Sequence, residues 1–263
     1  MSELNGLDVI VLRSPRDDDP LAAAIVALGG QVHQLPVQRI VPLADDDTQI
    51  DAQIKRISTY DKAIFVSRNA TALALRWLDR SCLSLPFKMQ CFTVGPTSAQ
   101  LLGQRHIQVV YPPRQSTSEG LLMLPALQEV YGQNIIVFRG VGGRPLLGDT
   151  LAERGAQVDY CELYQRQPDR QWKKKLLELL GADEHPPVLV AHSGGILDAL
   201  LTVVGTEQTK SVLTIPTVVP GQRLREYARK TGFQQVITAK SALAEDMERA
   251  VVDWYTQKPA PGR

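Results

Sequence analysis

The sequence contains few of the residues that mark metal, haem or disulfide chemistry. Its 263 residues include three cysteines, four histidines and 6% aromatic residues. Cys82, Cys91 and Cys161 are an odd number without the spacing of a metal site, so we expect reduced core residues and no metal. The histidines are scattered and give no spacing for a metal or a histidine dyad.

The chain also lacks an excess of charge and a long apolar run. A net charge of +1 gives no overall field that would attract nucleic acid or an anionic membrane. No apolar run approaches the roughly 20 residues of a membrane span. The first residues lack a basic segment, and Val9–Leu12 is too short for the core of a signal peptide. We therefore expect a cytoplasmic protein without nucleic-acid or membrane partners.

The stretch Asn134–Arg166 contains a clear pattern of strand and helix signals. Ile135–Phe138 is a short apolar run followed by a glycine cluster, as expected for a buried parallel strand. Pro145 stands where a helix could begin, Gly155 stops that helix, and Val158–Leu163 is rich in strand-forming residues. The stretch predicts a strand–helix–strand unit with a polar turn after its first strand.

This layout occurs twice in the chain. Equivalent residues are 126 positions apart, since 139 − 13, 155 − 29 and 193 − 67 all equal 126: Arg13 and Arg139, Gly29 and Gly155, Ser67 and Ser193. We interpret the chain as two copies of one module, with a period much longer than that of a solenoid.

The alternation of strand and helix patterns predicts an α/β fold with two parallel-sheet, flavodoxin-like lobes. Pro36–Leu43 and Gln167–Asp169 occupy equivalent places as extended connectors, which indicates two chain crossings between the lobes. Further along, the patterns predict a helix over Glu119–Val130 and a strand over Leu213–Val218.

Polar and basic residues follow the predicted strands. The basic residues in these turns are Arg13, Arg68, Arg139, Arg144 and Lys240. The hydroxyl and glycine residues in the same turns are Ser67, Thr97, Ser98, Gly140, Ser193 and Gly194. Thr97 or Ser98 would cap the helix that follows. Because the carboxyl ends of parallel strands share one edge of a sheet, these residues would suit a ligand with several carboxylates, held where two such edges face each other.

Two motifs match the sequence signatures of other enzyme classes, but each match is incomplete. Ala191-His192-Ser193-Gly194-Gly195 is similar to a nucleophile elbow, but the first glycine is Ala191 and no histidine follows, which argues against a serine hydrolase. Gly140-Val141-Gly142-Gly143 is similar to a dinucleotide fingerprint, but Pro145 replaces its third glycine. A nicotinamide oxidoreductase and a non-catalytic binding protein or sensor for a small anion remain alternatives.

Short motifs in the order of the chain resemble the uroporphyrinogen-III synthase family. They are Arg13-Ser14-Pro15, Phe65-Val66-Ser67-Arg68-Asn69, Val94-Gly95-Pro96-Thr97-Ser98-Ala99, Tyr111-Pro112, Arg139-Gly140 and Leu163-Tyr164-Gln165-Arg166. The resemblance implies a cofactor-free lyase of porphyrin biosynthesis with two lobes, residues 1–38 with 168–263 and residues 42–163. The connectors would be residues 39–41 and 164–167.

The resemblance also implies the reaction. Linear hydroxymethylbilane would lose its ring A hydroxyl to give an azafulvene, pass through a spiro-pyrrolenine and close with ring D inverted. Tyr164, facing the cleft between the lobes, would assist departure of the hydroxyl, while Ser67, Thr97 and Ser193 would contact substrate. The chain departs from the family pattern at His192. The protein is expected to be a monomer, and a transient contact with hydroxymethylbilane synthase is left open.

Overall fold

The computed structural model describes residues 3–15, 18–113, 115–181 and 186–257. The chain divides into two compact units. Unit 1 consists of Met1–Arg39 and Gln167–Arg263, and unit 2 consists of Ile40–Arg166. Both divisions fall inside the ranges 39–41 and 164–167 expected for the connectors.

Unit 1 is built on a parallel sheet with the strand order β11-β10-β9-β1-β2. Its strands are β1 (Asp8–Val11), β2 (Gln31–Gln34), β9 (Val188–Val190), β10 (Thr217–Pro220) and β11 (Val236–Ala239). Its helices are α1 (Pro20–Ala27), α7 (Lys173–Leu180), α8 (Gly194–Val204), α9 (Thr206–Thr214), α10 (Gly221–Thr231) and α11 (Ala244–Thr256). Counted within the unit, the order is 2-1-3-4-5, that of flavodoxin-like sheets.

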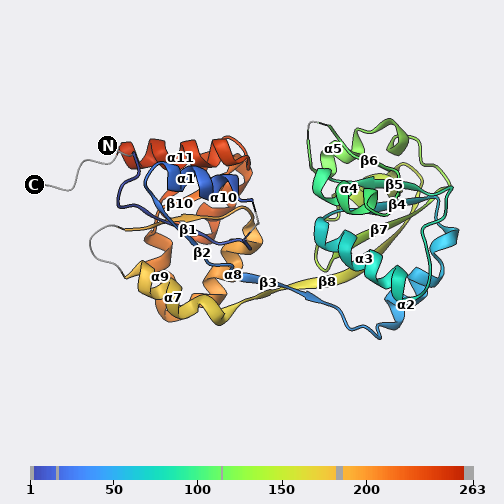
Figure 1. The fold of residues 1–263 in the computed structure, drawn as a ribbon, viewed down its shortest axis with the longest axis horizontal. Helices are drawn as coiled ribbons and strands as arrows, with labels where there is room; N and C mark the ends of the chain where they lie inside the picture. The colour runs from blue at the N-terminus through green and yellow to red at the C-terminus, as the bar shows by residue number, and fades with distance from the viewer. Residues whose placement is uncertain (1–2, 16–17, 114, 182–185, 258–263) are drawn as a thin grey trace, which may run out of the picture. The chain divides into compact units, whose positions relative to one another are not determined.

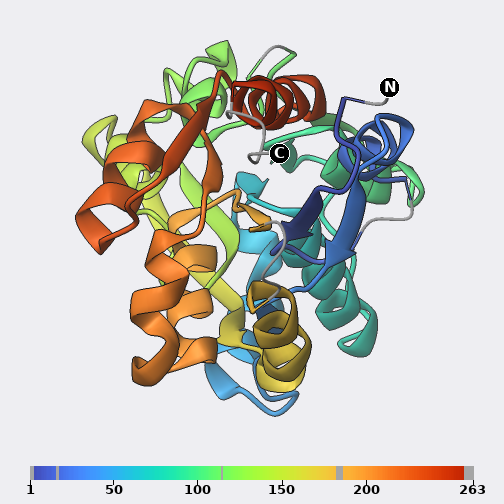
Figure 2. The same ribbon diagram turned by 90° about the vertical axis from the view of Figure 1, so that its left-hand side faces the viewer.

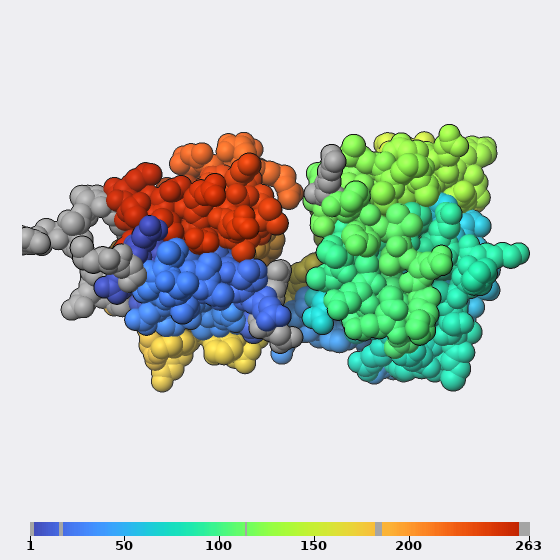
Figure 3. All heavy atoms as spheres, turned by 45° about the horizontal axis from the view of Figure 1, so that its top comes forward, coloured from blue at the N-terminus to red at the C-terminus, as the bar shows by residue number. Residues whose placement is uncertain are grey.

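Alternate residues of β1 face opposite layers of helices in unit 1. Val9 and Val11 pack with residues of α1 and α11, whereas Ile10 and Leu12 pack with residues of α7, α8 and α10. Figures 1 and 2 show α11 on one side of the sheet and α7 on the other. In Figure 3 the red atoms of α11 lie against the blue atoms of α1. Burial on both faces explains why β1 is apolar from Val9 to Val11.

Unit 2 has the strand order β3-β8-β7-β4-β5-β6. Its strands are β3 (Gln38–Pro42), β4 (Lys62–Phe65), β5 (Gln90–Thr93), β6 (Val109–Val110), β7 (Asn134–Gly140) and β8 (Gln157–Pro168). Its helices are α2 (Thr48–Lys55), α3 (Arg68–Arg80), α4 (Pro96–Gly103), α5 (Ser118–Leu122) and α6 (Leu146–Glu153). Residues of α2, α3 and α4 cover one face of the sheet, and residues of α5 and α6 cover the other.

The two units follow one plan. The ranges of α1 and α6 differ by 126 at both ends, since 146 − 20 and 153 − 27 both give that number. Strands β2 and β8, and β4 and β9, also begin 126 positions apart (157 − 31 and 188 − 62). With these pairs matched, β8-β7-β4-β5-β6 repeats the order β2-β1-β9-β10-β11. This agreement is consistent with the duplicated module expected from the sequence.

The chain passes from one unit to the other within β3 and β8. These strands are hydrogen-bonded neighbours, and the division of the chain falls inside both of them. Leu43 N donates to Leu163 O at 3.0 Å, and Asp169 N donates to Val37 O at 2.8 Å. Unit 2 is therefore entered and left through adjacent strands.

Two predicted elements are different in the structure. The helix expected over Glu119–Val130 is interrupted: α5 ends at Leu122, and Pro125 begins a separate 3₁₀ turn, Pro125–Leu127. The strand expected from Leu213 begins only at Thr217, because α9 continues to Thr214.

The cysteines differ in environment. Cys91 and Cys161 are buried, and burial raises the pKa of the Cys91 thiol to about 11 and that of Cys161 to about 12. Both are therefore neutral core residues, as expected. Cys82 is exposed, contrary to expectation, in the turn after α3.

Candidate functional site

Tyr164 lies beneath the carboxyl edge of the unit 2 sheet. The sequence predicts a phenol facing a ligand, but the structure buries the residue completely. The pairing of β7 with β8 shifts at this point: Arg139 pairs with Glu162 but Gly140 pairs with Tyr164. This bulge lets Leu163 and Tyr164, although consecutive, both join the same core. The Tyr164 ring therefore packs in the core and is not exposed at the surface.

Gly140 makes room for the Tyr164 ring. A Cβ atom at residue 140 would lie 2.5 Å from Cε2 of Tyr164 and 2.6 Å from Cζ. Such contacts are far inside van der Waals distance, so only glycine fits without movement of the ring. The predicted site residue Gly140 therefore positions Tyr164.

The phenol oxygen of Tyr164 has two polar neighbours. It lies 3.1 Å from Oγ of Ser67, and Nη2 of Arg166 donates to it at 3.1 Å. Ser67 is the N-cap of α3, where its Oγ also accepts from Ala70 N at 3.1 Å. Arg166 belongs to the same sequence motif as Tyr164, but the motif alone does not predict this contact. Its place two residues after Tyr164 on one strand was the available signal, because residues i and i+2 share a face.

Arg139 is buried and already paired. Its Nε lies 3.3 Å from Oε1 of Glu162, its Nη2 donates to Gly143 O at 2.5 Å, and its guanidinium lies 4.2 Å from the centre of the Tyr160 ring. These contacts hold the turn after β7. Arg144, in the same loop, forms an ion pair with Glu119 at 2.7 Å.

The turn after β5 exposes a helix end without a side-chain cap. The sequence predicts Thr97 or Ser98 as the cap, but α4 begins at Pro96 and its N-cap is Gly95, with no side-chain hydrogen bond. That prediction is wrong because proline is accommodated at the first helical position and so moves the start forward. Thr97 is exposed and Ser98 is buried. Arg68, the first residue of α3, is exposed at the same sheet edge.

Arg13 occupies the equivalent edge of unit 1. Its Nη2 donates to Oδ1 of Asp19 at 2.7 Å, and its Nε lies 3.4 Å from Nε2 of His192. Asp19 is the N-cap of α1 and accepts from Ala22 N. The Arg13 side chain is only 11% exposed, so it stabilises the conformation of this edge and extends little into solvent.

Ser193, Gly194 and Lys240 also follow strands of unit 1. Ser193 is exposed at the N-cap position of α8, where its side chain makes no capping hydrogen bond. A Cβ atom on Gly194 would lie 2.8 Å from the ring of Tyr227, so this glycine allows a close approach. Lys240 is exposed directly after β11.

The two edges share the features of an anion site. The N-termini of α4, α8 and α10 have no side-chain cap, so their backbone N–H groups can bind oxygen anions. Exposed cations, Arg68 and Lys240, stand at the same edges. Among the residues that the structure describes, no group of three His, Cys, Asp or Glu side chains could hold a metal.

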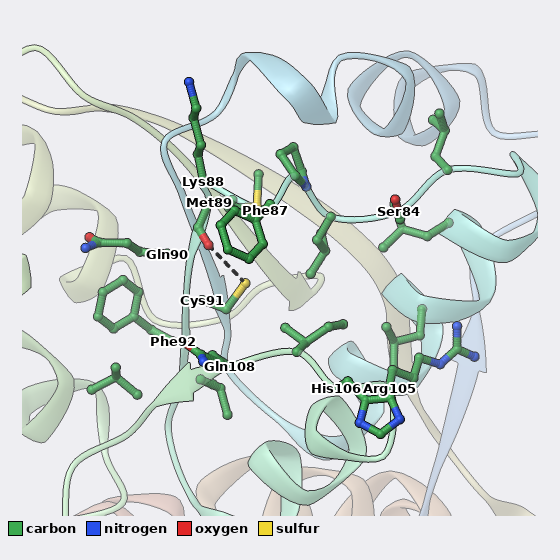
Figure 4. Close-up of a pocket in the computed structure, with 18 of the residues that line it drawn as sticks. Ser84, Phe87, Lys88, Met89, Gln90, Cys91, Phe92, Arg105, His106 and Gln108 are labelled. Carbon is green, nitrogen blue, oxygen red and sulfur yellow. Dashed lines mark hydrogen bonds between the residues drawn. The ribbon is translucent and has the colours of Figure 1, made fainter.

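A groove of about 1140 Å³ lies at the opposite edge of the unit 2 sheet. Figure 4 shows Met89, Gln90 and Cys91 at the start of β5, and Arg105 and Gln108 before β6, around this groove. Its lining includes none of the predicted site residues. The carboxyl edges remain the better candidate, because in open α/β sheets ligands bind there.

Comparison with known proteins identifies the family. The sequence profile described as "Uroporphyrinogen-III synthase HemD" matches residues 19–248. The chain is 28% identical to uroporphyrinogen-III synthase of Escherichia coli (strain K12) over 257 residues, which cover 93% of this chain and all of that protein. It is 28% identical to the enzyme of the same name from Salmonella typhimurium over 255 residues, 93% of this chain and all of that protein.

Solved structures agree on the fold. A mutant uroporphyrinogen III synthase from the extremely thermophilic bacterium Thermus thermophilus superposes with a TM-score of 0.62 at 17% identity, covering 97% of this chain and 100% of that one. Uroporphyrinogen-III synthetase from Helicobacter pylori gives a TM-score of 0.61 at 13% identity, covering 94% and 99%. With the profile matching most of its length, the chain belongs to the uroporphyrinogen-III synthase family.

Proposed function

We propose that the protein is a uroporphyrinogen-III synthase, a lyase that closes linear hydroxymethylbilane to uroporphyrinogen III with ring D inverted. The family match over residues 19–248 carries this conclusion. The structure contributes a hydrogen-bonded hydroxyl pair, the partly exposed Ser67 and the buried Tyr164, at a sheet edge that also has an uncapped helix N-terminus.

The reaction needs a protein that imposes geometry. Loss of the ring A hydroxyl gives an azafulvene, which ring D attacks at its substituted carbon to form a spiro-pyrrolenine. Fragmentation and closure then leave ring D inverted, whereas the free bilane closes to the symmetrical isomer I. Holding one conformation of a flexible chain is catalysis by positioning.

We infer that the bilane's eight carboxylates bind the uncapped helix ends and exposed cations of both units. The exposed candidates are Arg68, Thr97, Ser193 and Lys240, and Gly194 beside Ser193 is half-buried. Ser98 is buried in α4, and Gly140 supports Tyr164. Arg13 and Arg139 already pair with Asp19 and Glu162, so we assign them to holding the edges in shape. That the ligand binds between the units stays a prediction.

One assay tests the function. The purified protein is supplied with hydroxymethylbilane, and the uroporphyrin isomers are resolved after oxidation. Isomer III is the expected product. Isomer I alone would overturn the proposal and favour the alternative of a non-catalytic binding protein, while a response to NADH or NADPH titration would favour an oxidoreductase.

We further propose that the protein acts as a monomer in the cytoplasm, using no cofactor. In support, each unit has its own hydrophobic cores on both faces of its sheet. In the described part of the chain no helix is long and apolar enough to cross a membrane. Sedimentation at working concentration should give a mass near 29.0 kDa. A transient contact with hydroxymethylbilane synthase stays a prediction.

A further inference from the structure

The hydrogen bonds around Tyr164 have a direction. A guanidinium has only donors, so Arg166 must donate to the phenol oxygen of Tyr164. The phenol hydrogen then needs an acceptor, because a buried donor without a partner is destabilising. Across the described residues Ser67 Oγ, at 3.1 Å, is the acceptor within reach.

Ser67 Oγ consequently receives two hydrogen bonds. One comes from the Tyr164 phenol and the other from the backbone N–H of Ala70, also at 3.1 Å. A serine oxygen has two acceptor positions, and both are then filled. The hydroxyl hydrogen of Ser67 is left to donate outward, away from the Tyr164 phenol.

The solvent exposure of Tyr164 and Ser67 agrees with this direction of the hydrogen bonds. Tyr164 is fully buried, whereas Ser67 is partly exposed where β4 enters α3, at the carboxyl edge of the sheet. A ligand at that edge could reach the Ser67 hydroxyl without any movement of the core. Reaching the phenol directly would require the residues that cover it to move.

We propose that Ser67 is the group that donates the proton to the departing ring A hydroxyl, and that Tyr164 and Arg166 are positioning residues behind it. This inference rests on the proposed function. Departure breaks the C–O bond, and the electrons of the pyrrole ring form the azafulvene system, initially as its cation. The leaving oxygen takes the Ser67 proton and departs as water.

In the same step, the proton that Ser67 gives up is replaced through the hydrogen bond from Tyr164. Ser67 Oγ takes the proton of the Tyr164 phenol, and the resulting phenolate is stabilised by the positive charge of Arg166, which itself keeps its proton. Aromatisation of the last pyrrole to close releases one proton, which restores the phenol. Hydrogen bonds linked in a chain strengthen one another, so the pair should act as a unit.

Single-turnover formation of isomer III from hydroxymethylbilane tests the relay. Ser67→Ala and Tyr164→Phe are each expected to lower the rate about 100-fold, the lower end of the range for a positioned proton donor. The double variant should be no more than about threefold slower than either single variant, because groups that act as a unit are not additive. Independent contributions would instead multiply.

Controls separate the relay from structural roles. Ser67→Thr keeps both the cap and the hydroxyl, so it should retain most of the rate. Asp47→Ala removes a comparable cap, that of α2, and should lower the urea midpoint of unfolding without changing the rate. A proton inventory in mixed light and heavy water should be curved for the wild type, where two protons move, and linear for Tyr164→Phe.

The outcomes distinguish the two levels of the proposal. Isomer I alone from the wild-type protein overturns the proposed function and the relay together. Isomer III from the wild type with a full rate in Ser67→Ala overturns the relay alone and leaves the function standing. A large loss in Tyr164→Phe with little loss in Ser67→Ala would make the phenol the direct donor, which also contradicts the relay.

Discussion

Residues at equivalent positions of the two units contact the starts of equivalent helices, but their side chains are chemically different. Tyr164 of unit 2 corresponds to Gln38 of unit 1, since 164 − 126 = 38. Tyr164 contacts the Ser67 hydroxyl at the start of α3, whereas Gln38 donates to Gly195 O at the start of α8, at 2.7 Å. The position serves in both units to fix a helix end against a strand, and unit 2 adds a phenol to it.

The serines at these helix ends differ in the same way. Ser67 caps α3 and is tied to Tyr164, while Ser193, 126 positions later, is exposed and makes no cap. A hydroxyl fixed at both sides suits proton transfer, and an open helix end suits a carboxylate. Under the proposed function, one backbone plan would therefore place the proton-donating hydroxyl in unit 2 and an additional carboxylate-binding edge in unit 1.

Gly140→Ala should break this comparison most severely. Unit 1 has the exposed Ser14 at the equivalent position (140 − 126), and Gln38 in place of Tyr164. In unit 2 the new methyl group would displace the Tyr164 ring, at an expected cost of about 1–3 kcal/mol of stability. We expect the rate of isomer III formation to fall at least as far as in Tyr164→Phe.

Urea unfolding and single-turnover kinetics measure the two effects of Gly140→Ala. Gly103→Ala is the matched control, because a Cβ atom there meets nothing within 4 Å and should stabilise α4 by about 0.5–1 kcal/mol. An unchanged rate in Gly140→Ala would mean that the ring position does not matter for the reaction.

Lys62→Val would make β4 resemble β9, because residue 62 corresponds to Val188. Lys62 is buried and donates to Gln90, and desolvation lowers its pKa from the ordinary 10.5, while the charge of Asp61 opposes the shift. Below the lowered pKa the folded protein carries the whole cost of the buried charge. As pH rises from there to 10.5, the unfolded chain binds more protons, so wild-type stability rises relative to the variant.

Urea midpoints at pH 7 and in the alkaline range measure this difference. We expect the advantage of Lys62→Val over the wild type to shrink as pH increases. Parallel pH profiles for the two proteins would show that burial of Lys62 is without consequence for its charge.

Thr97→Ala should have a smaller effect on activity than Tyr164→Phe. Thr97 is exposed in the first turn of α4. Counted from the first residue of each helix, it corresponds to Gln222 of α10, since 222 − 97 and 221 − 96 both equal 125. Removing one carboxylate contact among many should raise KM with little change in kcat, a loss below about tenfold in kcat/KM. A fall in kcat as large as that of Tyr164→Phe would place Thr97 in the reaction itself.

Arg144→Met should have the smallest effect. A hydrogen bond from Arg144, helped by a backbone N–H, lowers the pKa of Glu119 to about 2. The pair contributes above the ordinary carboxyl pKa of 4.5, and the contribution is lost as pH falls towards 2. Because both side chains are nearly half exposed, we expect a loss below about 1 kcal/mol at pH 7. Urea unfolding at pH 7 and pH 3 measures it, and an equal difference at both values would contradict the pairing.

The sequence predicted the fold in considerable detail because local patterns determine strands and helices in this protein. The offset of 126 located β1, β4, α1 and their partners, since apolar runs and glycine stops are local signals. It did not predict α9, whose sequence TEQTKSVLT has only weak apolar periodicity. Nor could it decide where α4 begins, because Pro96, Thr97 and Ser98 are all compatible with a helix start.

The sequence predicted that the candidate site residues follow strands at the sheet edges, but it did not predict their contacts. That Tyr164 lies under Gly140 depends on a one-residue shift between β7 and β8, which no pattern within either strand records. The partners of Arg13 and Arg139, Asp19 and Glu162, likewise come from the folded arrangement.

The passage of the chain through β3 and β8 bears on how the protein is made. Unit 2 is complete once residue 166 has been synthesised, whereas the β1 strand of unit 1 must wait for β9 to occupy its other side. The ribosome therefore releases a middle segment that can fold while the amino-terminal strands still lack half their sheet. On stalled nascent chains, we expect protease protection to reach residues 40–166 before residues 8–34. Strand β1, whose residues face a hydrophobic core on both sides, is the segment that would need shielding from aggregation during synthesis.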